Sequence, residues 1–372
     1  MTEKFDSVLL IGGSGFLGLH LIQKFYDMTP RPSINVFDVR PLPEKLSKQF
    51  TFNPSDINFY QGDLTSFNDV NHAVQSSHAQ VIVHSASPMH GQPSEIYEKV
   101  NVQGTRNVLD VCSKNHFVKL LVYTSSAGVI FNGQDIHNGD ETWPIPEVPM
   151  DAYNETKAIA EDMVLKANSM DTEEGGDGFY TVALRPAGIF GPGDRQLVPG
   201  LRTVAKLGQS KFQLGDNNNL FDWTYAGNVA DSHVLAVQKI LNLQNNNDNN
   251  EVSTKDYNRD VVSKIAGQTF FITNDTPTYF WSLARTVWKA DGHIDKKVIV
   301  LKRPVAILAG YLSEFFSKLL GKEPGLTPFR VKIVCASRYH NIEKAKTLLG
   351  YKPNVDIEQG IKNTLAWMDE GL

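Results

Sequence analysis

Short apolar, β-rich runs alternate with segments of helical periodicity through the first half of this chain. A strand, a crossover helix and the next strand pack back together as a parallel pair, so a repeated alternation builds a sheet covered by helices on both faces. The sequence therefore predicts an α/β fold with a doubly wound parallel sheet. The predicted strands lie within residues 7–12, 34–39, 57–64, 79–87, 120–126 and 181–190.

The strict alternation fades after about residue 190. We predict a nucleotide-binding domain over residues 1–190, and a second part over residues 191–372 that is mainly a smaller, substrate-binding lobe above the carboxyl ends of the strands. Two polar segments with almost no apolar residues, 169–178 and 242–260, are predicted to be solvated loop insertions.

Composition and charge narrow the partners and the compartment. A chain of 372 residues with 41% hydrophobic residues can bury a full core, and a net charge of −5 does not suit a nucleic-acid partner. Cys112 and Cys335 each lie in an apolar stretch, so we expect free, buried thiols in a reducing compartment. Residues 1–7 are polar and lead directly into a strand, so we expect no cleavable signal and a protein that faces the cytosol.

Three glycines follow the first predicted strand in the stretch LLIGGSGFLGLHLI, residues 9–22. Without Cβ atoms, Gly12, Gly15 and Gly18 permit a tight turn, let backbone N–H groups approach a pyrophosphate and allow the next helix to pack closely on the strand. The apolar run before them and the amphipathic segment after them indicate a dinucleotide site of a Rossmann-type domain. Phe16 and Leu17 lie in the same turn and are predicted to line that site.

Asp38 ends the second predicted strand, at the roughly 20-residue distance from the glycines that a ribose-binding acid requires. Its carboxylate can accept both hydroxyls of an adenosine ribose and would repel a 2′-phosphate, so NAD is favoured as the cofactor. Arg40 leaves NADP open, because a guanidinium two residues further on can pair with that phosphate. The alternative for Arg40 is a solvated surface residue.

The next two predicted strands end in the same crevice, where open parallel sheets bind ligands. The third ends in GDL, from which we predict Asp63 and Leu64 as contacts of the adenine. The fourth ends in HSAS, from which we predict contacts of the cofactor by Ser85, Ala86 and Ser87. Ordinary loop chemistry is the alternative for both.

The strongest catalytic signal is the stretch DAYNETKAIAED, in which Tyr153 and Lys157 stand four residues apart and share one face of a predicted helix. A phenol with a pKa of about 10 is a poor base at neutral pH, and a neighbouring ammonium stabilises the phenolate. The same lysine can hydrogen-bond the ribose of a nicotinamide cofactor. The preceding strand delivers three hydroxyls into the crevice, those of Thr124, Ser125 and Ser126, and one of them can orient the reacting oxygen.

In this order along the chain, the stretches GGSGFLG, GDL, YTSSAGV, YNETK and LRPAGIFGPGD resemble the extended short-chain dehydrogenase/reductase superfamily. The resemblance implies that Tyr153 is the acid/base and Lys157 its partner. It makes Ser126 the main catalytic hydroxyl and Ser125 the second choice, because only the following AGV separates them. It further implies a cofactor-side set that supports the active site or adjoins the nicotinamide, namely Asn101, Pro186, Ala187 and Ile189.

Two later segments, residues 220–236 and 327–353, resemble the 3β-hydroxysteroid dehydrogenase branch, and most of all its enzymes that oxidise and decarboxylate 4α-carboxysterols. The implied reaction is NAD(P)-dependent oxidation of a sterol 3β-hydroxyl with loss of CO₂, in C4 demethylation during sterol biosynthesis. The implied setting is the cytosolic face of the endoplasmic reticulum membrane, with a homodimer and other enzymes of C4 demethylation as partners. Arg195 is a candidate for binding the substrate carboxylate, with a plain surface arginine as the alternative.

Residues 303–320 have the pattern of an amphipathic helix. They are too few and too charged for the roughly 20 apolar residues of a membrane span. One face carries Ile307, Leu308, Tyr311, Leu312, Phe315 and Leu319, and the basic residues at its start are Lys296, Lys297, Lys302 and Arg303. We predict that this helix lies on an anionic membrane surface, with an amphipathic core helix as the alternative.

Other functions share part of this pattern. A nucleotide-sugar epimerase or reductase would share the cofactor and the Tyr/Lys pair but needs a polar, phosphate-binding lobe, and a flavonoid-type carbonyl reductase would use NADPH, against which Asp38 speaks. The activity of another 3β-hydroxysteroid dehydrogenase is a further alternative. A regulator that only senses NAD would need the glycines but not the Ser, Tyr and Lys set.

Overall fold

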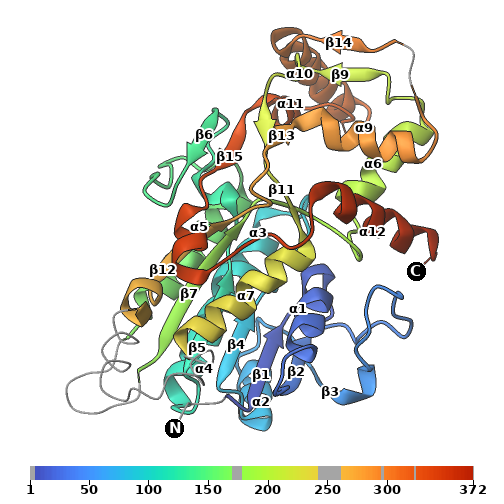
Figure 1. Ribbon diagram of the computed structural model, residues 1–372. Helices are drawn as coiled ribbons and strands as arrows, with labels where there is room; N and C mark the ends of the chain where they lie inside the picture. The colour runs from blue at the N-terminus through green and yellow to red at the C-terminus, as the bar shows by residue number, and fades with distance from the viewer. Residues whose placement is uncertain (1–4, 170–177, 242–260, 295–296, 322–323, 372) are drawn as a thin grey trace.

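The computed structural model describes residues 5–169, 178–241, 261–294, 297–321 and 324–371. Its centre is a seven-stranded parallel sheet in the order β12-β7-β5-β4-β1-β2-β3 (Figure 1). The strands are β1 (Ser7–Ile11), β2 (Ser33–Asp38), β3 (Ile57–Gln61), β4 (Val81–His84), β5 (Leu120–Thr124), β7 (Tyr180–Pro186) and β12 (Gln268–Ile272). The prediction of a doubly wound parallel sheet is confirmed.

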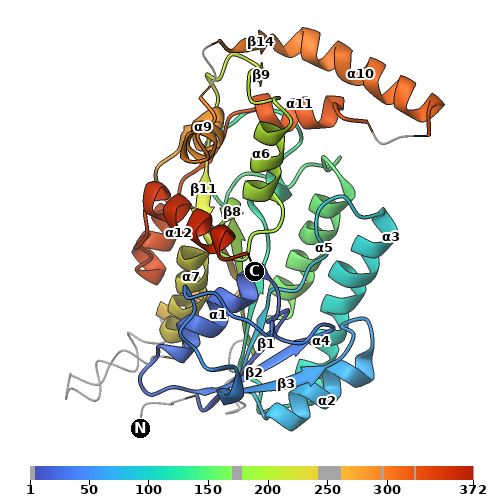
Figure 2. The ribbon, with the colours of Figure 1, turned by 90° about the vertical axis from the view of Figure 1, so that its right-hand side faces the viewer.

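Strand β1 shows why both faces of the sheet need helices. Val8 and Leu10 belong to one buried cluster, whereas Leu9 and Ile11 belong to a second one on the opposite face, because successive side chains of a strand point to opposite sides. One face is covered by α1 (Phe16–Tyr26) and α7 (Ala226–Ile240) (Figure 2). The other is covered by α2 (Phe67–Ser77), α4 (Gly104–Lys114) and α5 (Ala152–Lys166).

The chain after residue 190 contributes to the sheet layer as well as to the region above it. Strand β12 pairs in parallel with β7 at the edge of the sheet, and α7 packs against β5 and β7. The region above the carboxyl ends of the strands contains a mixed sheet in the order β13-β10-β15-β6 and a cover of helices. Its strands are β6 (Ile136–Gly139), β10 (Leu220–Phe221), β13 (Thr278–Tyr279) and β15 (Arg338–His340).

The remaining elements connect or cover these sheets. Two short parallel pairs join β8 (Gly188–Phe190) to β11 (Trp223–Tyr225) and β9 (Phe212–Leu214) to β14 (Ile299–Leu301). The other α-helices are α3 (Ser94–Tyr97), α6 (Leu197–Lys206), α9 (Phe280–Ala290), α10 (Arg303–Leu319), α11 (Pro328–Cys335) and α12 (Ile357–Asp369). The short 3₁₀ and π turns are η1 (Pro54–Asp56), η2 (Glu98–Gln103), η3 (Ala127–Ile130) and η4 (Ala345–Leu349).

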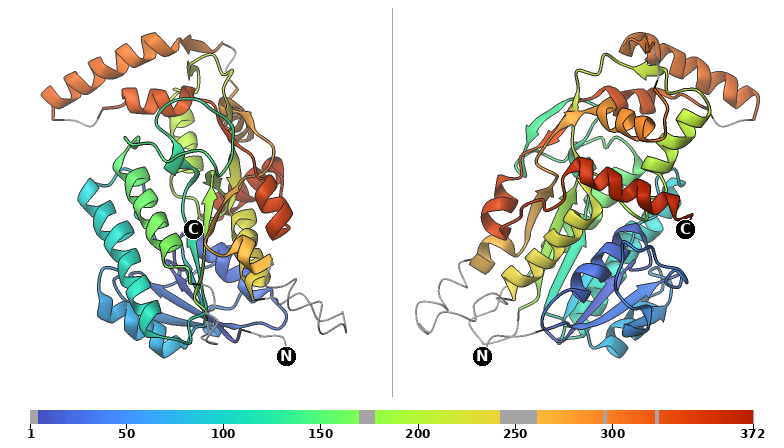
Figure 3. Two further views of the ribbon diagram at one scale, coloured as in Figure 1. Left: turned by 90° about the vertical axis from the view of Figure 1, so that its left-hand side faces the viewer. Right: turned by 45° about the vertical axis from the view of Figure 1, so that its right-hand side comes forward.

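Helix α10 lies across the outer end of the molecule, with α11 packed against it (Figure 3). Ala306 and Gly310 are buried, and a Cβ atom at Gly310 would lie 2.7 Å from the backbone nitrogen of Pro328 in α11. The opposite face is exposed, with relative exposures between 51% and 68% for Leu308, Tyr311, Leu312, Phe315, Phe316 and Leu319. The alternative of a core helix is therefore wrong, because a core helix buries its apolar face. Within the described residues, we find no helix with the length and hydrophobicity needed to cross a membrane.

The structure also bears on the predictions for the two cysteines and for the polar loops. Cys112 is buried and free as expected, but Cys335 is free and only half-buried, because it ends α11 near the outer end of the molecule. The predicted loop at 242–260, residues 170–177 of the loop at 169–178, and Lys296 lie outside the described residues.

Candidate active site

The glycine-rich turn joins β1 to α1 in a shape that excludes side chains. Gly12 has a φ of +85°, and a Cβ atom there would lie 2.7 Å from the Ala86 backbone after β4. A Cβ atom at Gly18 would collide with the carbonyl oxygen of Gly12. Helix α1 starts at Phe16 with no side-chain cap, so the N–H groups of its first turn are free to bind an anion.

Asp38 lies at the edge of this turn, at the end of β2. Its Oδ2 accepts a hydrogen bond from the backbone N–H of Ser14 at 3.1 Å, and its Oδ1 accepts one from the N–H of Arg40 at 3.1 Å. The carboxylate is buried, while the side chain of Arg40 is exposed. The residues at this edge thus fit the ribose and the pyrophosphate of a dinucleotide.

The other strand ends line the same crevice with backbone and side-chain hydrogen bonds. The Oδ1 of Asp63 accepts from the N–H of Thr65 at 2.8 Å, and a Cβ atom at Gly104 would lie 2.7 Å from the Cγ of Leu64. The hydroxyl of Ser85 donates to the carbonyl of Ile11 at 3.1 Å. These contacts fix the shape of the loops after β3 and β4.

Asn101 connects the loop after β4 to helix α5. Its Oδ1 accepts from the hydroxyl of Ser87 at 3.0 Å, and its Nδ2 donates to the Oγ1 of Thr156 at 3.0 Å. Since the amide bonds to both sides, Asn101 holds the cofactor side of the crevice against the helix that carries Tyr153 and Lys157.

Helix α5 places Tyr153 in its first turn, because Asp151 caps the helix by accepting from the N–H of Asn154 at 2.7 Å. Lys157 lies one turn further on and is buried, with 2% of its surface exposed. Its Nζ donates to the carbonyl of Thr124 at 2.6 Å and to the hydroxyl of Tyr123 at 3.2 Å. Lys157 therefore bonds the end of β5, and Tyr153 bonds Ser126 just after that strand.

Burial moves the pKa of both groups. It lowers the pKa of Lys157 to about 7, against the opposing effect of the Glu161 carboxylate. It raises the pKa of Tyr153 to about 12, while a hydrogen bond with the Ser126 side chain acts in the opposite direction. A Tyr153 phenolate therefore needs the hydroxyl of Ser126 and a positive charge nearby.

The three hydroxyls at the end of β5 have different surroundings. Ser126 bonds Tyr153 and also accepts from the N–H of Gly128 at 3.1 Å. Ser125 is buried, and its Oγ has no hydrogen-bond partner among the described residues. The hydroxyl of Thr124 forms a hydrogen bond with His233 at 2.8 Å, so Thr124 turns its carbonyl, and not its hydroxyl, to Lys157.

Strand β7 ends at Pro186 on the other side of the crevice. The N–H of Ala187 donates to the carbonyl of Ile272 at 3.1 Å, and Ile189 continues in β8, which pairs with β11. This segment leads from the sheet into the region above it. Residues from both parts of the chain, 1–190 and 191–372, thus form the predicted nicotinamide side of the site.

Two aromatic rings that the sequence analysis did not select lie on Tyr153. The ring of His90 has its centroid 4.1 Å from that of Tyr153, with the planes at 51°, and the ring of Tyr97 meets Tyr153 edge-on at 5.7 Å. The hydroxyl of Tyr97 donates to the carbonyl of Met89 at 2.9 Å and accepts from the N–H of Gln92 at 3.2 Å, which fixes the loop that carries His90. The sequence could have indicated His90, because its loop follows the strand end at Ser85–Ser87 that was predicted to contact the cofactor.

Arg338, which lies far downstream in the sequence, brings a positive charge to the Tyr153 region. The guanidinium of Arg338, in β15, lies 4.4 Å from the ring centre of Phe131 and 4.6 Å from that of Phe221. Its Nη2 donates to the carbonyl of Ile333 at 3.2 Å, its Nε has no hydrogen-bond partner within the described part of the chain, and burial lowers its pKa to about 10. The negative charge of Asp151 opposes this lowering, and the positive charge of Arg338 lowers the pKa of His90. Arg338 therefore lies on the Tyr153 side of the lobe. Arg195, in contrast, is exposed.

The arrangement combines a dinucleotide-binding turn, a buried lysine beside a tyrosine with a hydroxyl partner, and a cation between two aromatic rings. Such a site can remove a proton from an alcohol while a bound nicotinamide takes a hydride from the same carbon. The guanidinium of Arg338 can also bind an anionic group.

Comparison with known proteins identifies the family. The model of the 3-beta hydroxysteroid dehydrogenase/isomerase family matches residues 9–303. This chain belongs to that family. The matched range contains the glycine-rich turn, the Ser/Tyr/Lys set and His90, and it ends where α10 begins.

Several curated relatives of this chain share one description. The sterol-4-alpha-carboxylate 3-dehydrogenase, decarboxylating, of Saccharomyces cerevisiae is 73% identical over 370 residues, covering 100% of both chains. The human protein of the same description is 35% identical over 360 residues, covering 96% of this chain and 86% of its own.

Among solved structures, a Thermus thermophilus UDP-glucose 4-epimerase in complex with NAD superposes with a TM-score of 0.65 at 19% identity, covering 98% of this chain and 99% of its own. The structure named gox2253 superposes with a TM-score of 0.70 at 20% identity, covering 98% of both chains. At these identities the likeness shows the fold, and it agrees with the Rossmann-type sheet.

Proposed function

We propose that this protein oxidises the 3β-hydroxyl of a 4α-carboxysterol to a ketone with loss of CO₂, a step of C4 demethylation in sterol biosynthesis. The description shared by the close relatives supports the substrate class. The observation that carries the proposal is Arg338, a half-buried cation beside the Tyr153 site that forms no ion pair with a described carboxylate. A carboxylate on the carbon next to the reacting alcohol would fill that role.

The cofactor is NAD, with NADP as the alternative. The residues that would hold it are the glycine-rich turn with Phe16 and Leu17, Asp38 for the ribose, and the loops after β3, β4 and β7. When bound, it supplies the hydride acceptor. The exposed Arg40 is where a 2′-phosphate would find a cation, although the buried Asp38 would repel that phosphate.

Tyr153 takes the proton of the 3β-hydroxyl, and Lys157 and Ser126 lower the free energy of its phenolate. Ser126, and not Ser125, is the hydroxyl in this role, because it bonds Tyr153. Asn101 holds the two sides of the site together. The ketone formed at C3 lies β to the carboxylate, so the electron pair left by CO₂ passes to the ketone oxygen as an enolate. The hydroxyl of Tyr153 can hydrogen-bond that oxygen.

Arg338 binds the carboxylate in the Michaelis complex. Between Phe131 and Phe221 the guanidinium lies in surroundings of low polarity, where a charge-assisted hydrogen bond is strong and a lone cation is costly. Arg195 is too exposed to offer the same gain.

The test replaces Arg338 with methionine, which keeps the apolar stem and removes the charge. Loss of a hydrogen bond to a charged group costs about 1.5–3 kcal/mol, so kcat/KM for a 4α-carboxysterol should fall roughly 10- to 150-fold while the affinity for NAD⁺ is kept. Arg195→Met is the matched control and should retain the parent value. A loss in Arg195→Met but not in Arg338→Met would contradict this assignment.

We also propose that residues 1–190 form the cofactor-binding domain and that residues 191–372 mainly form the substrate-binding lobe. Arg338, Phe221 and the α10 surface all come from the second part, which supports this division. Strand β12 and α7 are the segments of that part that serve the sheet.

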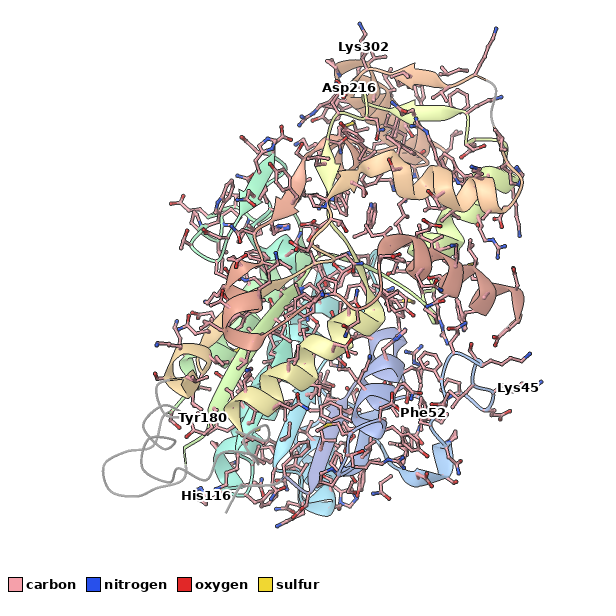
Figure 4. The ribbon with its side chains drawn as sticks, in the orientation of Figure 1. Lys45, Phe52, His116, Tyr180, Asp216 and Lys302 are labelled. Carbon is pink, nitrogen blue, oxygen red and sulfur yellow. The ribbon has the colours of Figure 1, made fainter. Side chains whose placement is uncertain are left out.

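The exposed face of α10 is proposed as a membrane-binding surface. Neighbouring β14 and β9 extend it, since Ile299, Val300 and Phe212 are 41% to 49% exposed. Lys302 and Arg303 begin the helix, and Figure 4 shows Lys302 at the end of the molecule opposite to His116 and Tyr180. Apolar side chains in the acyl boundary with basic residues at the headgroups are typical of a helix that lies on an anionic membrane.

This surface supports a peripheral position on the membrane in which sterols are found. The endoplasmic reticulum as that membrane, its cytosolic face, a homodimer and contacts with other enzymes of C4 demethylation stay predictions from the family resemblance.

A further inference from the structure

The proposed reaction removes one proton from the substrate and adds one at another atom, so it needs a residue that can move a proton between the two places. Oxidation removes a hydride from C3 and a proton from the 3β-hydroxyl. Loss of CO₂ leaves an electron pair, and C4 must take up one proton before the 3-ketone is complete. One proton is lost at the hydroxyl and one is gained at C4. The same proton can therefore be used for both steps if a group transfers it from Tyr153 to C4.

His90 occupies the place for such a group. Its imidazole lies against the ring of Tyr153, with centroids 4.1 Å apart, and the loop that carries it is fixed from two sides. The hydroxyl of Tyr97 donates to the carbonyl of Met89 at 2.9 Å, and the Nε2 of Gln196 donates to the carbonyl of His90 at 3.3 Å. Both contacts use the backbone of the loop and leave the imidazole free to act.

The charged groups around His90 come from two other elements. Asp151 and Lys157 belong to the start of α5, and Arg338 belongs to β15. In the proposed complex, O3 of the sterol lies at Tyr153 and the carboxylate lies at Arg338. C4 joins these two groups, so it lies in the region that His90 faces. Among the described residues, the imidazole nitrogens form no hydrogen bond with another side chain.

We propose that His90 is a further catalytic residue, which carries a proton from Tyr153 to C4 after CO₂ has left. The bond between C4 and the carboxylate breaks, its pair forms the C3–C4 double bond, and the ketone pair moves to O3. One nitrogen of the neutral His90 imidazole gives its proton to C4, and the ketone re-forms. The other ring nitrogen takes the hydroxyl proton from Tyr153, which becomes a phenolate again, so the imidazole stays neutral throughout. This inference rests on the proposed function.

The experiment follows the proton at C4. The parent protein, His90→Ala and His90→Phe are each incubated with a 4α-carboxysterol and NAD⁺ in D₂O, and the ketone is reduced at once with borohydride to stop exchange. The parent should place deuterium on one face of C4. Both variants should give a mixture of the two faces and should lose turnover roughly 100- to 10,000-fold, the range of a general acid. Added imidazole should restore both rate and stereochemistry in His90→Ala, and His90→Phe should resist rescue because its ring fills the space.

Each result decides between the alternatives. Parent-like turnover and a single C4 stereochemistry in His90→Phe would show that His90 only packs on Tyr153 and would overturn the inference. A loss in His90→Ala that imidazole does not restore, in a protein with the parent melting temperature, would overturn it as well. A parent protein that forms neither NADH nor CO₂ would instead refute the proposed function itself.

Discussion

Ser125 and Ser126 are adjacent in the chain but have different surroundings, which gives a test at the scale of one hydroxyl. The Ser126 side chain bonds Tyr153 and holds its pKa below the value that burial alone would give, whereas the Ser125 hydroxyl is buried without such a bond. The base must be deprotonated to accept the alcohol proton. Ser126→Ala should therefore raise the pKa of Tyr153 and move the acid limb of the kcat/KM profile to higher pH.

Ser125→Ala is the matched control for this profile. It removes a hydroxyl of the same kind from the same strand end and should leave the position of the acid limb where the parent has it. A shift in Ser125→Ala with none in Ser126→Ala would reverse the assignment of the two serines. The measurement is kcat/KM for the carboxysterol as a function of pH.

The sequence could identify the site residues whose spacing is local. Four residues along a helix place Tyr153 and Lys157 on one face, and three glycines after an apolar run mark the turn at Gly12. Arg338 could not be found in this way, because the pairing of β15 with β10 and β6 brings it across from the other end of the chain. The sequence offered Arg195 instead, since it follows a recognised motif, but its side chain is exposed.

At the scale of the element, strands were predictable where β-rich runs alternate with helices. The six strands expected from those runs are the other six strands of the central sheet, all of which precede β12 along the chain. Strand β12 was not foreseen, because it follows a long polar segment and its partner β7 lies far back in the sequence. Helix α10 shows the same limit, since its periodicity defined an apolar face but could not show whether another element covers it.

The double substitution Leu312→Glu and Phe315→Glu tests what the α10 face binds. Both side chains are exposed, at 51% and 62%, so the charged variant should fold with the parent melting temperature. Removing two large apolar side chains from a lipid interface costs about 3–6 kcal/mol, so flotation with phosphatidylcholine vesicles that contain phosphatidylserine should be lost. The affinity for NAD⁺ should stay at the parent value.

Val148→Glu is the control for the added charge, because Val148 is 79% exposed on a different segment. It should float like the parent protein. Added salt should weaken binding of the parent without abolishing it, because the basic residues are screened and the apolar face is not. A folded α10 variant that floats as well as the parent would exclude this helix as the membrane contact.

At the scale of the whole molecule, three buried neutral histidines connect stability to pH. Burial lowers the pKa of His84 to about 3 and the pKa of His20 and His233 to about 4. Below the unfolded value of about 6.5 the unfolded chain binds more protons, so stability is full above that pH and is lost as the pH falls toward 4. Each histidine adds a slope of about 1.4 kcal/mol per pH unit.

The melting temperature should therefore drop steeply between pH 6 and pH 4. His233→Gln should flatten this slope, because glutamine can keep a hydrogen bond to Thr124 without titrating. A melting temperature that is constant across this range in the parent protein would show that these imidazoles do not stay neutral in the fold.

The central claim is that one site oxidises C3 and releases the C4 carboxylate. The most direct measurement incubates the purified full chain with NAD⁺ and a 4α-carboxysterol labelled with ¹⁴C in the carboxyl group, and follows NADH and ¹⁴CO₂ in the same sample. We expect the two products in equal amounts and neither of them from Tyr153→Phe, which should still bind NAD⁺. NADH without CO₂, or equal turnover by the parent and Tyr153→Phe, would contradict the claim.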